Sequence, residues 1–125
     1  MKLTAVLFTA AIFGITAEGA FAQDPVRLSP KMYTVLLEND QVRVLEYRCT
    51  PGEKEPMHSH PAVVAYSLTT SKFKATTRDG QTTEGEAKAG TAVWRDAVTH
   101  SSECLGSEQR TIITELKKVK TVSQE

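Results

Sequence analysis

Three histidines are the residues of this chain whose type and spacing could do chemistry. The only histidines in the sequence are His58, His60 and His100. The first two are separated by one residue in a run that we predict to be a strand, where alternate side chains face the same side. Both imidazoles can converge on one point, and an antiparallel neighbour could bring His100 opposite them. Three imidazole nitrogens with a free position are typical of a catalytic metal site. The alternative is three unrelated histidines.

The rest of the sequence predicts the short strands that would position these side chains. Runs rich in Val, Thr, Ile, Tyr and Leu alternate with Gly, Pro, Asn and Asp, as in all-β sandwiches and barrels. No segment after residue 22 has convincing helical periodicity. We predict an all-β fold with strands at 33–38, 42–49, 57–69, 72–78, 81–86, 91–95, 98–103 and 110–117.

Two glycine-led segments around the histidines resemble the motifs of the cupins. Residues 52–60, GEKEPMHSH, match the first cupin motif, in which five residues separate a glycine from H-x-H. Residues 90–100, GTAVWRDAVTH, resemble the second motif, although Asp96 and Val98 stand where proline and glycine are usual. The interval before the last histidine is one residue shorter, and Cys104 stands where asparagine is usual. The resemblance covers about residues 33–117 and implies a small, exported, single-domain cupin with a double-stranded β-helix, or jelly-roll, barrel.

The resemblance implies that His58, His60 and His100 bind one divalent metal ion, which could be iron, zinc, manganese, nickel or copper. The cupin pattern has a further glutamate ligand where this chain has Val64 and Ala65. Val64 shares the strand parity of the first two histidines, so we predict that it points at the metal in place of a carboxylate. The site would then hold three neutral histidines. It resembles the ferrous sites of thiol dioxygenases, and it equally fits a site that has lost its catalytic role.

Four more residues are candidates for a pocket beside the metal. Tyr66 and Trp94 could form its walls, because small-molecule sites are mostly apolar, and core packing is the alternative. Arg48 and Arg95 could hold a substrate carboxylate by paired hydrogen bonds, and exposed arginines are the alternative.

Cys104 and two glutamates are candidates closer to the ligands. Cys104 follows His100 by four residues and could reach the metal as a soft ligand, unless a turn at 105–106 begins first. Glu53 and Glu55 precede His58 and could orient its ring, or they could be solvated loop charges.

The first 22 residues predict an export signal. Lys2 precedes an apolar run, and Ala20-Phe21-Ala22 has the small residues that a signal peptidase requires. The alternative is a transmembrane helix, but the apolar run is shorter than the roughly 20 residues that a helix needs to cross a bilayer. We expect a signal peptide at 1–22, an N-terminal arm at 23–32, a cupin barrel at 33–118 and a C-terminal tail at 119–125. The expected location is the periplasm or the cell exterior.

Charge and cysteine content narrow the expected partners. Fifteen basic and fifteen acidic residues cancel, which argues against nucleic acid and, after signal cleavage, against a membrane. A small-molecule ligand or substrate is expected, and the resemblance to cupins implies that the chain forms a homodimer. Cys49 and Cys104 could form a disulfide in an oxidising compartment, or they could be buried free thiols.

Three functions fit these observations. The first is a metal-dependent enzyme acting on a small organic molecule, most plausibly an iron dioxygenase that uses the open coordination positions. The second is a non-catalytic periplasmic module that binds a small ligand or a metal. The third is a structural barrel that retains the histidines without using them.

Overall fold

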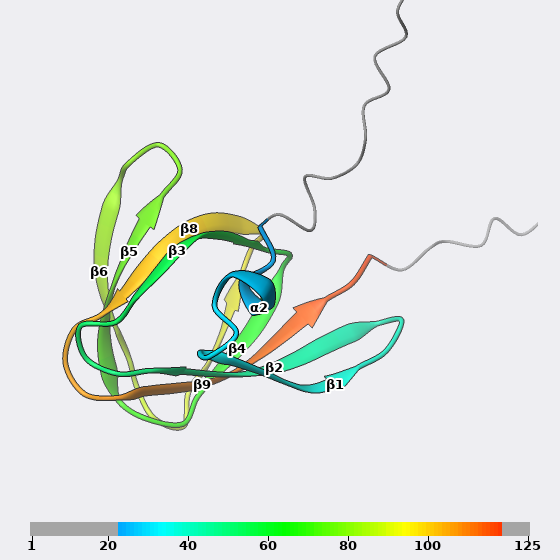
Figure 1. Ribbon diagram of the computed structural model, residues 1–125. Helices are drawn as coiled ribbons and strands as arrows, with labels where there is room; N and C mark the ends of the chain where they lie inside the picture. Colours follow the sequence, from blue (N-terminus) through cyan, green and yellow to red (C-terminus); the bar gives the residue numbers. More distant parts are fainter. Residues whose placement is uncertain (1–22, 119–125) are drawn as a thin grey trace, which may run out of the picture.

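The computed structural model describes residues 23–118, which form two antiparallel β-sheets and one short helix (Figure 1). The predicted signal peptide and C-terminal tail lie outside the described residues. In chain order the elements are α2 (Pro25–Leu28), β1 (Tyr33–Glu38), β2 (Val42–Cys49), β3 (Lys54–His60), β4 (Val63–Ser67), β5 (Ser71–Thr77), β6 (Thr82–Ala87), β7 (Ala92–Arg95), β8 (Val98–Cys104) and β9 (Gln109–Leu116).

The two sheets have the strand orders β1-β2-β9-β4-β7 and β3-β8-β5-β6. Strands distant in the sequence are neighbours in both sheets, as in β9 between β2 and β4 or β8 between β3 and β5. This arrangement confirms the predicted all-β jelly roll. The long-range pairing brings the segments that carry the histidines into one sheet.

The predicted strand at 57–69 is two strands, because Pro61 interrupts it. Proline has no backbone N–H to donate to a sheet ladder, so it is confined to strand ends, edge strands and bulges, and Pro56 lies at the register shift of the edge strand β3. β3 ends at His60 in one sheet, and β4 begins at Val63 in the other. The chain therefore changes sheet at this point, and side-chain parity before the proline does not continue after it.

The N-terminal arm packs on its own barrel. Asp24 caps the helix by accepting a hydrogen bond from the Val26 N–H at 3.1 Å, and the buried Pro25 occupies the first turn. The Ser59 N–H donates to the Gln23 carbonyl at 2.9 Å, which attaches the arm to β3. Figure 1 shows α2 lying against the barrel. The turn forms without helical periodicity because its cap and its burial stabilise it.

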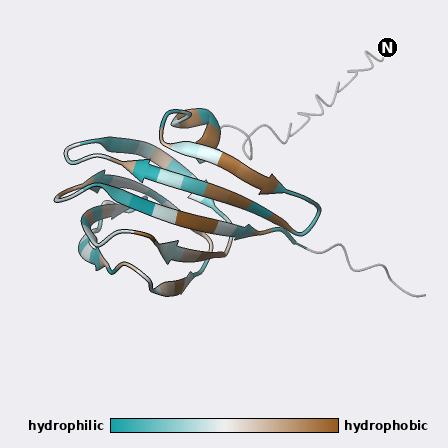
Figure 2. Cartoon of the chain, turned by 90° about the horizontal axis from the view of Figure 1, so that it is seen from below, coloured by the Kyte–Doolittle hydropathy of each residue, from teal (hydrophilic) through white to brown (hydrophobic). Residues whose placement is uncertain are grey.

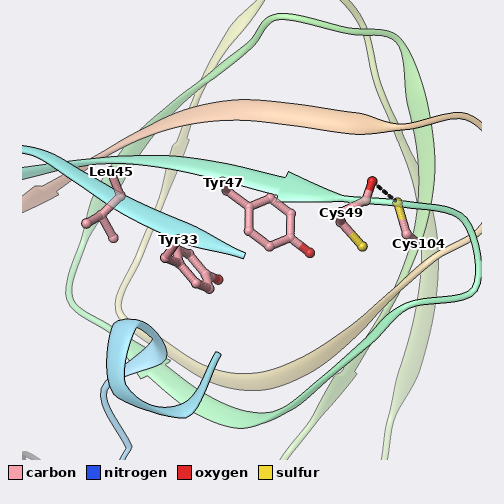
Figure 3. Close-up of a cluster of buried hydrophobic side chains, with 5 residues drawn as sticks. All are labelled: Tyr33, Leu45, Tyr47, Cys49 and Cys104. Atoms are coloured by element: carbon pink, nitrogen blue, oxygen red, sulfur yellow. Dashed lines mark hydrogen bonds between the residues drawn. The ribbon is translucent and has the colours of Figure 1, made fainter. Parts of the chain in front are cut away.

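A compact group of side chains forms the hydrophobic core (Figure 3). Its buried members are Tyr33, Leu45, Tyr47, Cys49 and Cys104. The rings of Tyr33 and Tyr47 lie 5.0 Å apart at a tilt, as aromatic pairs prefer. Cys49 and Cys104 are both free thiols, and the Cys104 thiol donates to the Cys49 carbonyl at 3.1 Å. Of the two alternatives for these cysteines, the structure therefore contains the buried free thiols and not the disulfide.

The β1 strand carries an exposed apolar stretch at the edge of its sheet. Figure 2 shows this strand in hydrophobic colours beside the helix. Val35, Leu36 and Leu37 are 42%, 51% and 50% exposed, and the pairing register with β2 shifts between Val35 and Leu37. Among residues 23–118, no helix has the length and apolar character needed to cross a membrane.

Candidate metal centre

The three histidines lie on two paired strands of one sheet. His58 and His60 alternate along β3, and both are buried, with exposed fractions of 1% and 8%. His100 on β8 is the direct cross-strand partner of His58. A shift in register between Glu55 and His58 marks an irregularity just before the first histidine. The predicted convergence of two neighbouring strands is confirmed.

The imidazole nitrogens lie close enough together to share one ion. Nε2 of His58 is 3.1 Å from Nε2 of His60, and one ring nitrogen from each of the three histidines lies within 4.8 Å of the other two. A point therefore exists within about 2.8 Å of all three, against about 2.1 Å for a metal–imidazole bond. The 3.1 Å separation itself is close to that of two nitrogens bound to the same ion.

Hydrogen bonds at Nδ1 fix which nitrogens of His58 and His60 carry a proton. Nδ1 of His58 is 2.9 Å from the Pro56 carbonyl, and Nδ1 of His60 is 2.8 Å from Oε1 of Glu115. Both partner oxygens accept, so both Nδ1 atoms must donate. In the neutral rings the two Nε2 atoms then present bare lone pairs to each other at 3.1 Å. A cation between them removes this repulsion, so the donor set fits a divalent metal ion.

Burial favours the neutral forms of His58 and His100. Burial lowers the pKa of His58 below its usual value, against the opposing effect of the Glu55 carboxylate. Burial lowers the pKa of His100 to about 3, and the repulsion that its charged form would meet from the other two imidazoles, if protonated, and from Arg95 adds to this effect. Neutral imidazole is the form that binds metals.

Glu115 on β9 orients His60, and it is a residue that the sequence analysis missed. Its carboxylate is 3% exposed and also accepts a hydrogen bond from Arg43 Nε at 2.6 Å. Burial alone would raise the pKa of this carboxyl, but the hydrogen bonds from His60 and Arg43 hold it below its usual value. Arg43 in turn pairs with Asp24 of the arm at 2.9 Å. A chain of alternating charges, buried at Glu115 and half-buried at Arg43 and Asp24, therefore supports one ligand.

Glu55 is a buried part of the site, whereas Glu53 is exposed. Glu55 is 5% exposed, and its Oε1 lies 3.8 Å from His58 Nδ1. It accepts hydrogen bonds from the hydroxyls of Tyr33, at 2.6 Å, and Ser102. Burial and the neighbouring Glu55 raise the pKa of Tyr33, so its hydroxyl stays protonated. Glu55 is therefore a buried charge beside His58 and not a solvated loop charge, while the hydrogen bond that orients the His58 ring goes to the Pro56 carbonyl.

A cavity of about 140 Å³ lies beside the histidines between the two sheets. Its lining includes His60 and His100, together with apolar and aromatic side chains from both sheets. Arg95 at the end of β7 also lines it, with its guanidinium carbon 5.5 Å from the centre of the Phe73 ring on β5. The cavity thus combines the histidine group with one cation and an apolar wall.

Val64 does not point at the histidines, which corrects the prediction. It is 37% exposed, whereas its neighbours Val63 and Ala65 are buried and line the cavity. The reason is the change of sheet at Pro61, which ends the strand parity carried by His60. Ala65 is therefore the small inward-facing residue in the stretch where cupins usually have a glutamate.

Tyr66 and Trp94 lie outside the lining of the cavity. They are 43% and 58% exposed on the outer face of the same sheet, where Trp94 pairs with Val64 across the strands. The Trp94 indole N–H donates to Asp96 at 2.9 Å. Alternation along β4 and β7 turns both rings outward, so neither the predicted pocket walls nor core packing describes them.

Arg48 and Cys104 also lie away from the histidine group. Arg48 is exposed and pairs with Glu46 at 2.6 Å. Cys104 remains on β8 and is buried, but its thiol donates to the Cys49 carbonyl in the core. Of the two arginines, Arg95 is the one that lines the cavity, and its side chain is also exposed to solvent.

Comparison with solved structures identifies the fold. A cupin domain from Bordetella pertussis Tohama I has a TM-score of 0.62 and 25% sequence identity, over 69% of this chain and 92% of that one. The chain has the cupin fold. An RmlC-like cupin with a double-stranded β-helix from Methanocaldococcus jannaschii matches with a TM-score of 0.55 and 15% identity, over 68% of this chain and 78% of that chain. A cupin superfamily protein from Desulfitobacterium hafniense DCB-2 matches with a TM-score of 0.53 and 13% identity, over 69% and 76%.

Searches by sequence give no further assignment. No family model matches the chain, and no curated protein matches it. The cupin fold and the group formed by His58, His60 and His100 fit metal binding. The activity has to be argued from this site.

Proposed function

We propose that this cupin binds one divalent metal ion through His58, His60 and His100 and uses it to hold a small organic molecule in the adjoining cavity. The observation that carries the proposal is the 3.1 Å approach of two Nε2 atoms whose rings both donate through Nδ1. An arrangement of bare lone pairs is stable only with a cation between them, and burial disfavours a charged imidazolium there.

The residues around the ion define the chemistry that it would supply. A divalent ion held by neutral imidazoles is a Lewis acid that polarises an oxygen or sulfur atom of a ligand. The buried Glu115 and the Pro56 carbonyl hold the rings of His60 and His58 in position. The Tyr33 hydroxyl, which also lines the cavity, donates a hydrogen bond to Glu55 and could donate to a bound molecule. Ala65 supplies no ligand from the stretch where cupins usually have a glutamate, so a coordination position is left for that molecule.

Metal analysis of the purified protein tests the proposal. We expect about one metal ion per chain after incubation with iron, zinc, manganese, nickel or copper salts in turn. His58→Ala and His100→Ala should each lower the affinity at least about tenfold, because a lost ligand costs more than a lost orienting residue. Ser59→Ala is the control, because Ser59 lies between two ligands but hydrogen-bonds away from them, to Gln23 and Thr99. Absence of uptake of every metal by the wild type would contradict the proposal.

We propose an iron dioxygenase as the enzymatic form of this function. The open side of the site and the Tyr33 hydroxyl, which donates to Glu55 beside the cavity, support it. The alternative is a non-catalytic module that binds a small ligand or metal. Oxygen consumption by the iron-loaded protein on a panel of thiols and polyphenols distinguishes the two, because the binding module consumes none.

We also propose export and homodimer formation. The basic start, apolar run and Ala20-Phe21-Ala22 sequence support cleavage after residue 22, which the mass of the secreted or periplasmic protein would test. The exposed apolar residues of the β1 edge, Val35, Leu36 and Leu37, support a dimer, which sedimentation velocity would test.

A further inference from the structure

Arg95 faces the cavity because of its place in the sheet. It is the direct cross-strand partner of Val63, whose side chain is 5% exposed and lines the cavity. Directly opposed residues of an antiparallel pair project from the same face. The β7 strand ends at Arg95, so the guanidinium group comes from the sheet edge and extends to Phe73 on the opposite sheet.

The guanidinium group of Arg95 has no carboxylate partner. Within residues 23–118, no hydrogen bond or ion pair joins it to another residue, and it contacts the Phe73 ring. The three other arginines of the strands differ. Arg43 pairs with Asp24 and Glu115, and Arg48 and Arg110 both pair with Glu46. Arg95 thus presents its hydrogen-bond donors to the cavity.

A second polar group in the same cavity also lacks a partner. The Thr111 hydroxyl belongs to a residue that is 5% exposed, lines the cavity and makes no hydrogen bond. A buried hydroxyl without a partner costs free energy that a ligand atom can recover. Two unpartnered polar groups therefore face the space next to the histidines.

The remaining charges restrict the ligand to a single negative charge. Glu55 and Glu86 line the same cavity. Glu55 accepts hydrogen bonds from Tyr33 and Ser102, and Glu86 is exposed on β6. Their carboxylates oppose a dianion such as a phosphate ester more strongly than a monoanion. The volume of about 140 Å³ is close to that of an engineered apolar cavity that holds benzene, so the body of the ligand is small.

We propose that the cavity binds a small organic monocarboxylate, with its carboxylate on Arg95 and its remaining atoms directed along the apolar wall toward the three histidines. The inference rests on the proposed metal-dependent function and names the class of molecule that the site takes. Arg95 acts as a specificity-determining residue, because a planar guanidinium matches a carboxylate through two parallel hydrogen bonds.

The test compares acids with their neutral isosteres on cobalt-loaded protein. Propanoate and benzoate are titrated beside propanamide and benzamide, with visible absorption of the cobalt ion and calorimetry as readouts. We expect both acids to bind and both amides to bind at least about tenfold more weakly. Arg95→Gln should weaken acid binding about 10- to 100-fold, and Arg95→Lys should fall between. Arg48→Gln is the matched control, because it removes an arginine that lies outside the cavity.

The outcomes separate the two proposals. Normal cobalt stoichiometry in wild type and Arg95→Gln, with acid binding lost only in the latter, supports the inference. Normal cobalt stoichiometry without binding of either acid by the wild type overturns the inference and leaves the metal function standing. Equal acid binding by wild type and Arg95→Gln, or equal binding of acids and amides, does the same. Failure of the wild type to take up any divalent metal overturns the metal function itself.

Discussion

Glu115 is the single residue on which the orientation of His60 depends. It accepts from Nδ1 at 2.8 Å, so that Nε2 is left to face His58. Glu115→Gln keeps an acceptor oxygen but removes the charge and leaves Arg43 without this partner. Loss of such an orienting group typically costs about 10- to 100-fold in metal affinity. We expect a decrease of this size, measured by competition with a chelator of known affinity.

The control for this change is Glu46→Gln on the outer side of β2. Glu46 pairs with Arg48 and Arg110, so the substitution also breaks ion pairs of a strand carboxylate, but away from the histidines. Its metal affinity should equal that of the wild type. An equal loss in both variants would mean that Glu115 acts through stability and not through His60.

The sequence predicts the ligands better than the residues that support them. His58 and His60 follow from H-x-H spacing, because strand alternation is a local rule. Glu115 belongs to a strand whose inward positions include Thr111 and Ile113. A charge among these uncharged inward positions was the signal in the sequence that could have identified it. Its meaning depends on the pairing of β4 with β9 and on the opposite sheet, which local rules do not give.

At the scale of elements, turn chemistry predicted most strands to within a residue or two. The strands at 33–38 and 42–49 agree with β1 and β2, and Gly80 adopts the positive φ of 86° expected in its hairpin turn. The prediction failed at Pro61, where an apolar and β-branched run on both sides concealed a change of sheet. That one proline accounts for the reversed orientation of Val64 and Tyr66.

The arm is an element whose attachment depends on pH. Burial alone would raise the pKa of Asp24, but the hydrogen bonds from Arg43 and the Val26 N–H, together with the charges of Arg43 and Arg27, hold the pKa below its usual value. A carboxyl with a lowered folded pKa stabilises the protein above its unfolded pKa, and this contribution disappears as the pH falls through the folded value. Asp24→Asn, which retains a capping side chain, should therefore destabilise the protein at pH 7 by about 1 kcal/mol.

The measurement is urea unfolding of both proteins across acidic pH. The difference in unfolding free energy between wild type and Asp24→Asn should stay constant above about pH 5 and shrink as the pH falls below this. Other carboxyls titrate in both proteins and cancel in the difference. A difference that does not change with pH would show that the Asp24 charge does not hold the arm on the barrel.

At the scale of the whole molecule, the site depends on both sheets at once. His58 and His100 belong to one sheet, and Glu115 and Arg95 belong to the other. The composition and turn spacing predicted a barrel, but only the closed jelly roll brings Glu115 of one sheet within hydrogen-bonding reach of His60 of the other. Metal binding should therefore stabilise the packing of the sheets, because a ligand bound only by the folded state favours it.

The two cysteines provide a measure of that packing. Cys49 and Cys104 are 1% exposed and come from β2 and β8, one in each sheet. Burial raises the pKa of Cys49 to about 12, and the thiolate is the reactive form, so a disulfide reagent at neutral pH should label neither thiol in the folded protein. In concentrated denaturant two thiols per chain should react. Metal should slow thiol labelling of the wild type and leave the labelling rate of His100→Ala unchanged. Fast labelling of the folded protein would show that the sheets separate without global unfolding.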